Sequence, residues 1–277
     1  MSLVVVASAT GAPGVTTTTI GLGAVWRQRP VVLEVDPHGA VIPARYGMPI
    51  RPGLVSLTGA VRHGADGEAD VLSHAQPLPG GLPVVVGAET PQQATSLLGS
   101  YGTRLGEWAA ASPMTILADV GRISMTSPAL GLIRRADIVT LLTSPELEDI
   151  RLGAWWVRQF RDRTNAGLLL VGDKPYGPSI IREDLGVDVL GVVADDAKGA
   201  RALAGLGSEK TLRRAPLVRS LRTIADHLAT TLPESDPAPS FRSEPDEELP
   251  EGRDSAGEPQ LGENADEEES TTGVEAS

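Results

Sequence analysis

Seven short apolar runs, rich in valine, leucine and isoleucine, constrain the fold of this 277-residue chain more than any other feature. Each run is apolar at nearly every position rather than at alternate positions. This pattern is typical of strands that are covered on both faces, as in a parallel sheet between two layers of helices. The runs are Leu3–Ala7, Val31–Val35, Leu82–Val86, Thr115–Val120, Ile138–Thr143, Leu168–Val171 and Val187–Val193.

Segments with helical spacing of apolar residues separate several of these runs. Strands that alternate with helices predict an α/β fold with a doubly wound, mostly parallel sheet of seven to eight strands and helices on both faces. An antiparallel α+β domain is the alternative. Residues 37–80, which are richer in glycine and proline, are expected to form short helices and loops. The predicted helices are Thr16–Arg27, where threonine is an acceptable N-cap, Pro91–Ala111, Glu146–Phe160 and Leu217–Leu232.

The composition changes abruptly after Leu232. Residues 233–277 contain 15 acidic residues and two arginines, a net charge of −13, whereas residues 1–232 are nearly neutral. The C-terminal segment has almost no aromatic or β-branched residues, so it cannot bury enough apolar surface to offset the entropy cost of ordering. We therefore predict a folded domain over residues 1–232 and a disordered acidic tail over residues 233–277.

The composition also argues against several classes of protein. The chain has no cysteine and only four, scattered histidines, so disulfide bonds and thiolate or histidine-rich metal sites are not expected. No apolar run approaches about 18 residues, so we expect no transmembrane segment. The first apolar run is too short for a signal peptide and lacks a basic flank. A cytoplasmic location is predicted.

A glycine-rich turn follows the first apolar run, in the sequence "ATGAPGVTTTT". Glycines before a helix let its free N–H groups approach an anion closely, which is how phosphate-binding loops work. Such loops also use a Ser or Thr hydroxyl to hold Mg²⁺ and a lysine to bind the terminal phosphates. Thr16 is the candidate for the metal, whereas Val15 stands in the lysine position. A plain strand-to-helix turn is the alternative. The candidate phosphate-binding residues are Gly11, Ala12, Pro13, Gly14, Val15, Thr16 and Thr17.

Two aspartates follow other predicted strands. Asp36 ends "VVLEVD" and Asp119 ends "TILAD". Carboxyl ends of strands in an open parallel sheet converge on one crevice, so both side chains are expected near the glycine-rich turn. We predict that Asp36 and Asp119 are the catalytic acids, with Asp119 joining Thr16 at Mg²⁺. Alternatively, each aspartate is a helix cap or turn residue. Arg122, which follows Asp119, is a candidate to face phosphate, but an ion pair with a nearby acid is the favoured interpretation.

Taken together, these segments resemble the MinD/ParA family of deviant Walker-A ATPases, which have a P-loop NTPase fold. The resemblance runs from about residue 3 to residue 231 through four ordered matches. The loop of this chain, "GAPGVTTT", is similar to that of lysine-poor actinobacterial members of the family, which are related to the CpaE/TadZ proteins of pilus assembly. The matches are the loop Ala9–Thr17, "EVDPHG" with Glu34 replacing the family's first acid, Leu141–Arg151 and Val189–Asp196.

The resemblance implies a nucleotide site that has lost its cations. The family uses one lysine in the loop and one signature lysine that reaches the partner's nucleotide across a dimer; Val15 and Thr10 stand at these positions. Each charge-assisted hydrogen bond contributes about 1.5–3 kcal/mol. We therefore expect ATP and Mg²⁺ binding to be weak or lost, and hydrolysis to suffer more than binding. On this interpretation the protein is a localisation or recruitment factor, acting as a homodimer or with a protein partner, for pilus, secretion or cell-organisation machinery.

Two other interpretations stay open. The chain could be a functional ATP-binding ATPase in chromosome partitioning or in septum or pilus positioning. It could also contact nucleic acid through its best basic cluster, although such a cluster is more often a solvated helix face. MinD ends in a basic amphipathic membrane helix, whereas the tail here is acidic, so no direct membrane anchor is expected. The basic cluster consists of Arg213, Arg214, Arg219 and Arg222.

The tail prediction can be tested by truncation. A chain that ends at Leu232 is expected to unfold at the same temperature as the full chain, because a disordered segment adds no packing. Calorimetry or circular dichroism on the two chains measures this. A clear drop in the unfolding temperature of the shortened chain would show that the acidic tail packs on the domain.

Overall fold

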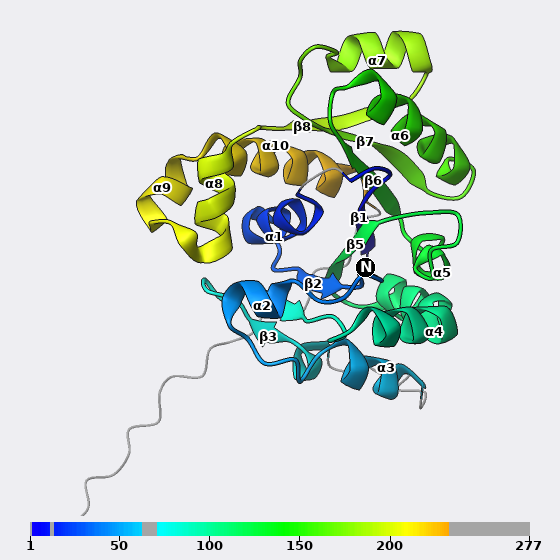
Figure 1. Cartoon of the computed structure of the whole chain (residues 1–277), viewed down its shortest axis with the longest axis vertical. Coiled ribbons are helices and arrows are strands. Elements are labelled where there is room, and N and C mark those ends of the chain that lie inside the picture. The colour runs from blue at the N-terminus through cyan, green and yellow to red at the C-terminus, as the bar shows by residue number, and fades with distance from the viewer. Residues whose placement is uncertain (1, 12–13, 63–70, 233–277) are drawn as a thin grey trace, which may run out of the picture. The chain divides into compact units, whose positions relative to one another are not determined.

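The computed structural model describes residues 2–11, 14–62 and 71–232, all within one compact unit. These residues form a single sheet in the strand order β3-β4-β2-β5-β1-β6-β7-β8, with helices on both faces (Figure 1). Every neighbouring pair is parallel except β3 and β4. The strands are β1 (Ser2–Ser8), β2 (Val31–Glu34), β3 (Gln76–Pro77), β4 (Pro83–Val85), β5 (Thr115–Arg122), β6 (Ile138–Thr143), β7 (Asn165–Val171) and β8 (Val189–Val193).

The continuous apolar runs are explained by burial on both faces of this sheet. All seven residues of β1 are buried, and successive side chains enter different hydrophobic clusters. Leu3, Val5 and Ala7 point to one face, whereas Val4 and Val6 point to the other. This alternation is the period of two that any strand has. The sequence shows no polar alternation because neither face of the strand meets water.

One face is covered by α1 and α10, which pack against each other. Gly21 of α1 allows this approach, since a Cβ there would lie 2.4 Å from Cδ1 of Leu221. Their apolar side chains join Val4 and Val6 in one cluster. The helical segments on this side are α1 (Val15–Val25), α2 (Ile42–Tyr46), α8 (Ala197–Arg201), the irregular turn η2 (Ala202–Leu206), α9 (Glu209–Arg214) and α10 (Pro216–Thr231).

The opposite face is covered mainly by α4 and α6. Thr90 caps α4, because its hydroxyl accepts a hydrogen bond from the Gln93 N–H, and Pro91 follows in the first helical position. The segments on this side are α3 (Leu54–Arg62), the short turn η1 (Val71–His74), α4 (Pro91–Ala111), α5 (Leu130–Ile133), α6 (Leu147–Phe160) and α7 (Pro178–Leu185). Within the described ranges, no helix combines the length and apolarity that crossing a membrane requires.

The predicted fold class, an α/β domain with a mostly parallel sheet of seven to eight strands, is confirmed. The described part of residues 37–80, which leaves out 63–70, contains the expected short helical segments and also the two-residue strand β3, which was not predicted. Helix α1 begins at Val15, one residue before the predicted start. Its N-cap is Gly14, with φ of 112°, so the prediction of a threonine cap is wrong. The predicted tail, 233–277, lies outside the described residues.

The contact between α1 and α10 yields a stability prediction. Leu221 is fully buried against Gly21, so Leu221→Ala would remove apolar contacts and leave a cavity. We expect a loss of about 2–5 kcal/mol in the free energy of unfolding. Leu206→Ala is the matched control, because Leu206 is 68% exposed, and it should change stability by less than about 0.5 kcal/mol. Urea titrations of both variants measure the difference, and equal effects would contradict the packing described.

Candidate functional site

The candidate site begins where β1 turns into α1. Gly14 adopts a left-handed conformation, and its carbonyl accepts the first helical hydrogen bond, from Thr18 N–H at 2.7 Å. No side chain caps this end of the helix. The N–H groups of the first turn therefore remain available to a ligand, and the helix dipole favours a negative charge there. Ala12 and Pro13, two of the predicted phosphate-binding residues, lie outside the described residues.

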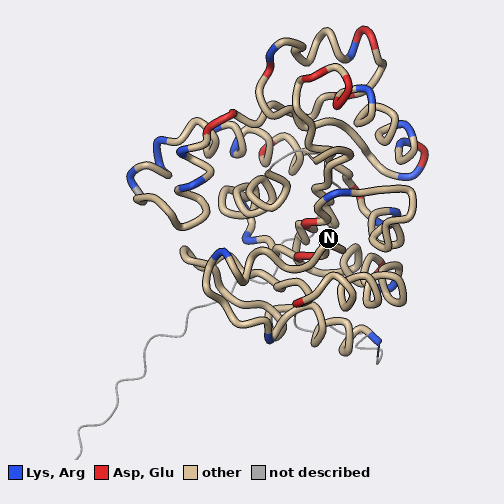
Figure 2. Tube along the Cα trace, in the orientation of Figure 1, with Lys and Arg blue, Asp and Glu red and all other residues tan. Residues whose placement is uncertain are grey.

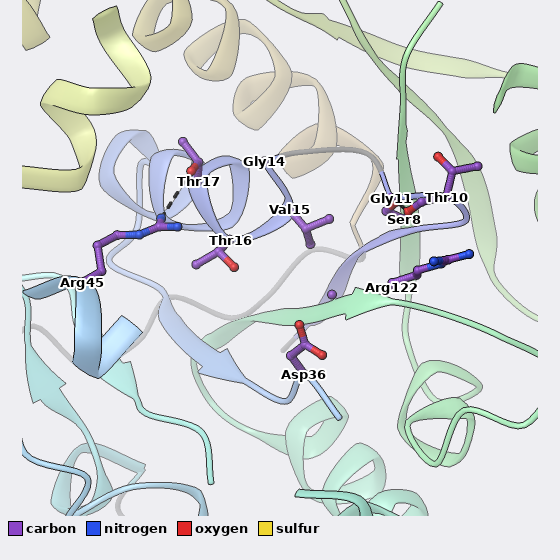
Figure 3. A pocket seen from close by; sticks show the side chains of 11 residues that line it. Ser8, Thr10, Gly11, Gly14, Val15, Thr16, Thr17, Asp36, Arg45 and Arg122 are labelled. Atoms are coloured by element: carbon purple, nitrogen blue, oxygen red, sulfur yellow. Dashed lines mark hydrogen bonds between the residues drawn. The ribbon is translucent and has the colours of Figure 1, made fainter. Parts of the chain in front are cut away.

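A cavity of about 250 Å³ lies at this helix end (Figure 3). Three parallel strands and α2 supply its remaining walls, so residues far apart in the sequence meet here. Hydroxyl groups and glycine backbone make up much of the lining. The lining residues are Ser8, Thr10, Gly11, Gly14, Val15, Thr16, Thr17, Asp36, Arg45, Gly121 and Arg122. The carboxyl-end crevice expected from the sequence is present, and it contains the predicted loop residues that the structure describes.

Asp36 lies in the cavity wall, just after the end of β2. Its Oδ1 accepts hydrogen bonds from the His38 N–H at 2.8 Å and pairs with His38 Nδ1 at 2.9 Å. The carboxylate also lies directly against Gly121, where φ is +66°; a Cβ at residue 121 would come within 2.0 Å of Asp36 Oδ2. Both the backbone angle and the space therefore require glycine at this position. Asp36 is the one acidic side chain among the described residues that line the cavity.

Asp119 lies behind the cavity wall rather than in it. It is fully buried, and neither carboxyl oxygen has hydrogen-bond geometry with any described group. Burial raises its pKa to about 7, and the nearby Glu34 and Asp36 carboxylates contribute in the same direction. The Thr16 hydroxyl and the Gly121 N–H face the carboxyl and partly offset that rise. Thr16, which also lines the cavity, is therefore the residue that links this buried carboxyl to it.

Glu34, the residue that replaces the family's first acid, has a structural role. Its buried carboxylate accepts three backbone hydrogen bonds: Oε1 from Val41 N–H at 2.6 Å and Ile42 N–H at 2.9 Å, and Oε2 from Gly87 N–H at 2.8 Å. Desolvation raises its pKa, whereas these three bonds lower it. Glu34 thus joins the end of β2 to the start of α2 and to the segment after β4. It does not line the cavity.

The structure places two arginines in the lining of the cavity: Arg45, which the sequence did not suggest, and Arg122, for which the sequence favoured an ion pair over a phosphate contact. Arg45 comes from α2, and its Nη1 donates to Thr17 Oγ1 at 3.3 Å (Figure 3). Arg122 ends β5, beside Ser8 of β1 in the sheet register. Neither forms an ion pair with any residue that the structure describes, so the expectation that Arg122 pairs with an acid is wrong. The sequence carried no signal for Arg45, which lies in a five-residue helix.

The two positions that hold lysine in the MinD/ParA family both lie at the cavity. Val15 lines it but is only 7% exposed, and its side chain belongs to the same hydrophobic cluster as Val4 and Leu142. This position therefore serves core packing. Thr10 lies at the other end of the loop, and its hydroxyl is buried without a hydrogen-bond partner in the described chain. Ser8, which the sequence did not suggest, also contributes a hydroxyl.

The side chains around the cavity meet only part of what Mg²⁺ requires. Among the described residues, no group of three or more His, Asp and Glu side chains is arranged to hold a metal. Mg²⁺ in nucleotide sites needs fewer protein ligands, because phosphate oxygens and water complete its octahedron. Thr16 supplies a hydroxyl in the cavity, with the unpaired carboxyl of Asp119 behind it. These two residues fit an ion that arrives with a phosphate ligand, and they do not form a metal site alone.

The predicted basic cluster lies elsewhere in the domain, on α9 and α10. Its arginines are all exposed, and Arg219 donates to the Arg214 carbonyl oxygen at 2.9 Å. Figure 2 shows basic positions gathered over α8 and α9. A second cavity of about 360 Å³ there is lined in part by Lys198, Lys210 and Arg214. Nothing in this geometry favours nucleic acid over the solvated face that such clusters usually form.

Solved structures of other proteins share the architecture of this chain. No protein-family model matches the sequence, and no curated protein matches it. Among solved structures, the ParA family ATPase of Chlorobium tepidum matches with a TM-score of 0.66 at 14% identity, over 82% of this chain and 98% of that one. The MinD–Mg-ADP complex of Pyrococcus horikoshii matches equally, at 14% identity over 82% and 95%.

The chain has the fold of the MinD and ParA proteins. The MinC:MinD complex of Aquifex aeolicus also matches, with a TM-score of 0.61 at 15% identity, over 87% of this chain and 99% of that chain. The described part of the sequence therefore accounts for nearly the whole MinD/ParA fold. At these identities, the likeness concerns the fold alone.

The buried carboxyl of Asp119 gives the protein a defined pH dependence. Its pKa is about 7 in the folded protein and near the ordinary 3.8 when unfolded, so between these values the folded state binds more protons. The free energy of unfolding therefore falls as pH rises through this range. Asp119→Asn removes the titrating group, so the variant should show a flatter pH dependence and exceed the wild type in stability above about pH 7.

Urea titrations of the metal-free protein between about pH 4 and 8 test this expectation. Asp162→Asn is the matched control for the loss of one carboxyl group, because Asp162 is exposed just after the end of α6. If Asp119→Asn were less stable than the wild type throughout this range, the carboxyl would have to be stabilised in its charged form, contrary to the burial described.

Proposed function

We propose that this chain is a positioning or recruitment protein of the MinD/ParA type, with a nucleotide pocket that binds ATP and Mg²⁺ weakly. One observation carries the proposal: a cavity at the N-terminus of α1 keeps Thr16 and Asp36, with Asp119 behind it, while Thr10 and Val15 occupy the lysine positions. On this proposal, the cavity is a triphosphate pocket that lacks the family's two lysines.

Similar structures support the class of ligand. A MinD of this fold was solved with Mg-ADP, and a McdA of this fold with ATP. In the present chain, the first-turn N–H groups of α1 would bind phosphate oxygens and the Thr16 hydroxyl would hold Mg²⁺. Asp119, behind Thr16, would orient that hydroxyl or a metal-bound water. When bound, ATP supplies the phosphoryl group for hydrolysis, and Mg²⁺ neutralises part of its charge.

Hydrolysis is expected to be slow in this pocket. Phosphoryl transfer is catalysed mainly by positioning and by neutralising charge on the transferred group, and the two lysines that do this in the family are absent. Asp36 remains in the wall, fixed by His38, where it is placed to orient a water molecule. The expected role of the pocket is therefore to bind nucleotide and change an interaction surface, rather than to turn nucleotide over rapidly.

A protein partner is the expected target of that surface. A MinD of this fold forms a complex with MinC, which illustrates recruitment of a second protein. We propose that the present chain likewise acts through a homodimer or a protein partner. The "GAPGVTTT" loop, which resembles lysine-poor relatives of the CpaE/TadZ proteins, points to pilus or secretion machinery as the assembly served.

Titration with a fluorescent ATP analogue and Mg²⁺ tests the pocket. Loss of two charge-assisted contacts lowers affinity by about 10²–10⁴-fold relative to a micromolar site, so we expect dissociation constants from about 0.1 to 10 mM. Asp119→Ala should weaken the Mg²⁺-dependent part of binding further. Absence of any binding in this range would overturn the nucleotide part of the proposal.

Restoring the lysines provides the complementary test. Thr10→Lys combined with Val15→Lys should tighten binding by at least about tenfold and produce dimers that form only with Mg-ATP, measured by light scattering. Leu152→Lys combined with Thr230→Lys is the control, because both residues are exposed on other helices and add the same charge away from the cavity. Tightening in the control as well would show a nonspecific charge effect. Circular dichroism establishes that each variant is folded.

A further inference from the structure

The candidate pocket lacks both family lysines, yet it is not without cations. Arg45 and Arg122 are the basic residues in its described lining; Arg45 lies beside Thr17, and Arg122 lies on the side of Ser8 and Thr10 (Figure 3). They come from α2 and β5, not from the loop itself. Neither position belongs to a motif that carries the family resemblance.

The environment of Arg45 leaves most of its hydrogen-bonding capacity unused. A guanidinium carries five N–H donors, and the one bond recorded here runs from Nη1 to Thr17 Oγ1 at 3.3 Å, which is long for such a contact. Figure 3 shows the side chain extending from α2 toward the first turn of α1, where Thr17 lies next to Thr16. Arg45 therefore points at the helix end that is suited to an anion.

The backbone around Arg45 is fixed by other contacts. Glu34 accepts the N–H groups of Val41 and Ile42 at the start of α2, and the Tyr46 hydroxyl donates to the Leu203 carbonyl oxygen at 2.7 Å. These bonds hold both ends of the five-residue helix. Arg45 is half-buried between them, so less conformational entropy is lost when it binds a ligand than for a free surface arginine.

Arg122 approaches the loop from the opposite side. It is the last residue of β5 and pairs with Ser8 in the register of β1 and β5, while the Ile123 N–H bonds to the Ser8 carbonyl oxygen at 2.9 Å. The backbone that carries Arg122 is thus attached to the strand from which the loop emerges. Its side chain is exposed and has no acidic partner among the described residues.

The balance of charge in the cavity favours an anion. Asp36 is the single acidic group in the described lining, and it is engaged with His38 and packed on Gly121. Arg45 and Arg122 also line the cavity, and the positive end of α1 opens onto it. Arginine binds phosphate oxygens through two parallel N–H groups, a geometry that lysine cannot offer. Unpaired arginines at the wall of a polar cavity are therefore suited to phosphate groups.

We propose that Arg45 and Arg122, from α2 and β5, bind the phosphate chain of the ligand and so compensate in part for the two lysines that the loop lacks. The inference rests on the proposed nucleotide pocket but concerns only the recognition of phosphates. It explains why a cavity of this shape persists around a loop with valine in the lysine position. The affinity of the pocket for phosphates then depends on residues outside the loop motif.

The experiment uses the full chain and two probes, tripolyphosphate and a fluorescent ATP analogue, each with Mg²⁺. Arg45→Gln and Arg122→Gln are each expected to weaken tripolyphosphate binding by about tenfold, and the double variant by about a hundredfold. Arg45→Lys, which keeps the charge but loses the two-pronged contact, should fall between wild type and Arg45→Gln. Arg104→Gln is the matched control, since Arg104 is exposed on α4, away from the cavity. Calorimetric titration gives the affinities, and circular dichroism establishes folding.

The outcomes separate this inference from the proposed function. Loss of tripolyphosphate binding in the two glutamine variants, but not in Arg104→Gln, supports the inference. If ATP then binds no more tightly than tripolyphosphate, the site recognises phosphates but not the nucleoside, and the proposed nucleotide pocket is wrong. Unchanged binding in the double variant overturns the inference and leaves the nucleotide pocket standing. A wild type that binds neither probe overturns the inference as well.

Discussion

The register of three parallel strands determines where every group of the site lies. Asp119 on β5 pairs with Val6 of β1 on one side and with Glu34 of β2 on the other. The carboxyl ends of these strands therefore lie at the same edge of the sheet, and the chain leaves each of them into the same crevice. A shift of one residue in either pairing would turn Asp119 to the other face of the sheet and separate it from Thr16.

The same register buries two acidic side chains. Glu34 and Asp119 lie on adjacent strands and are both fully buried, but their hydrogen-bond partners differ. Glu34 is satisfied by three backbone N–H groups, so it behaves as part of the scaffold. Asp119 has no comparable set of backbone donors; burial raises its pKa to about 7, and the nearby Thr16 hydroxyl and Gly121 N–H offset only part of that rise. Burial raises the pKa of Glu34 as well, so the two carboxyls differ in their partners and not in the direction of the shift.

Most of the fold could be predicted from the sequence because a strand that is buried on both faces is apolar at nearly every position, which is visible as a continuous apolar run. Ile138–Thr143 and Pro91–Ala111 were predicted to the residue. β3 was not, since a two-residue strand held by one antiparallel neighbour leaves no periodic pattern. Within the site, the position of Asp36 could be predicted because it follows a predicted strand, and that of Thr16 because it follows a glycine-rich loop. Arg45 could not, because its approach depends on how Glu34 anchors α2, a contact between distant residues.

The anchoring of α2 has a consequence beyond the cavity. Arg45 and Tyr46 are consecutive residues of a helix barely longer than one turn, so they cannot move independently. Tyr46 bonds to the backbone of η2, which leads into α9 and the basic segment before α10. Tyr46 and Leu203 lie 157 residues apart along the chain, so the bond between them connects the short helix that carries Arg45 to the segment that precedes α9.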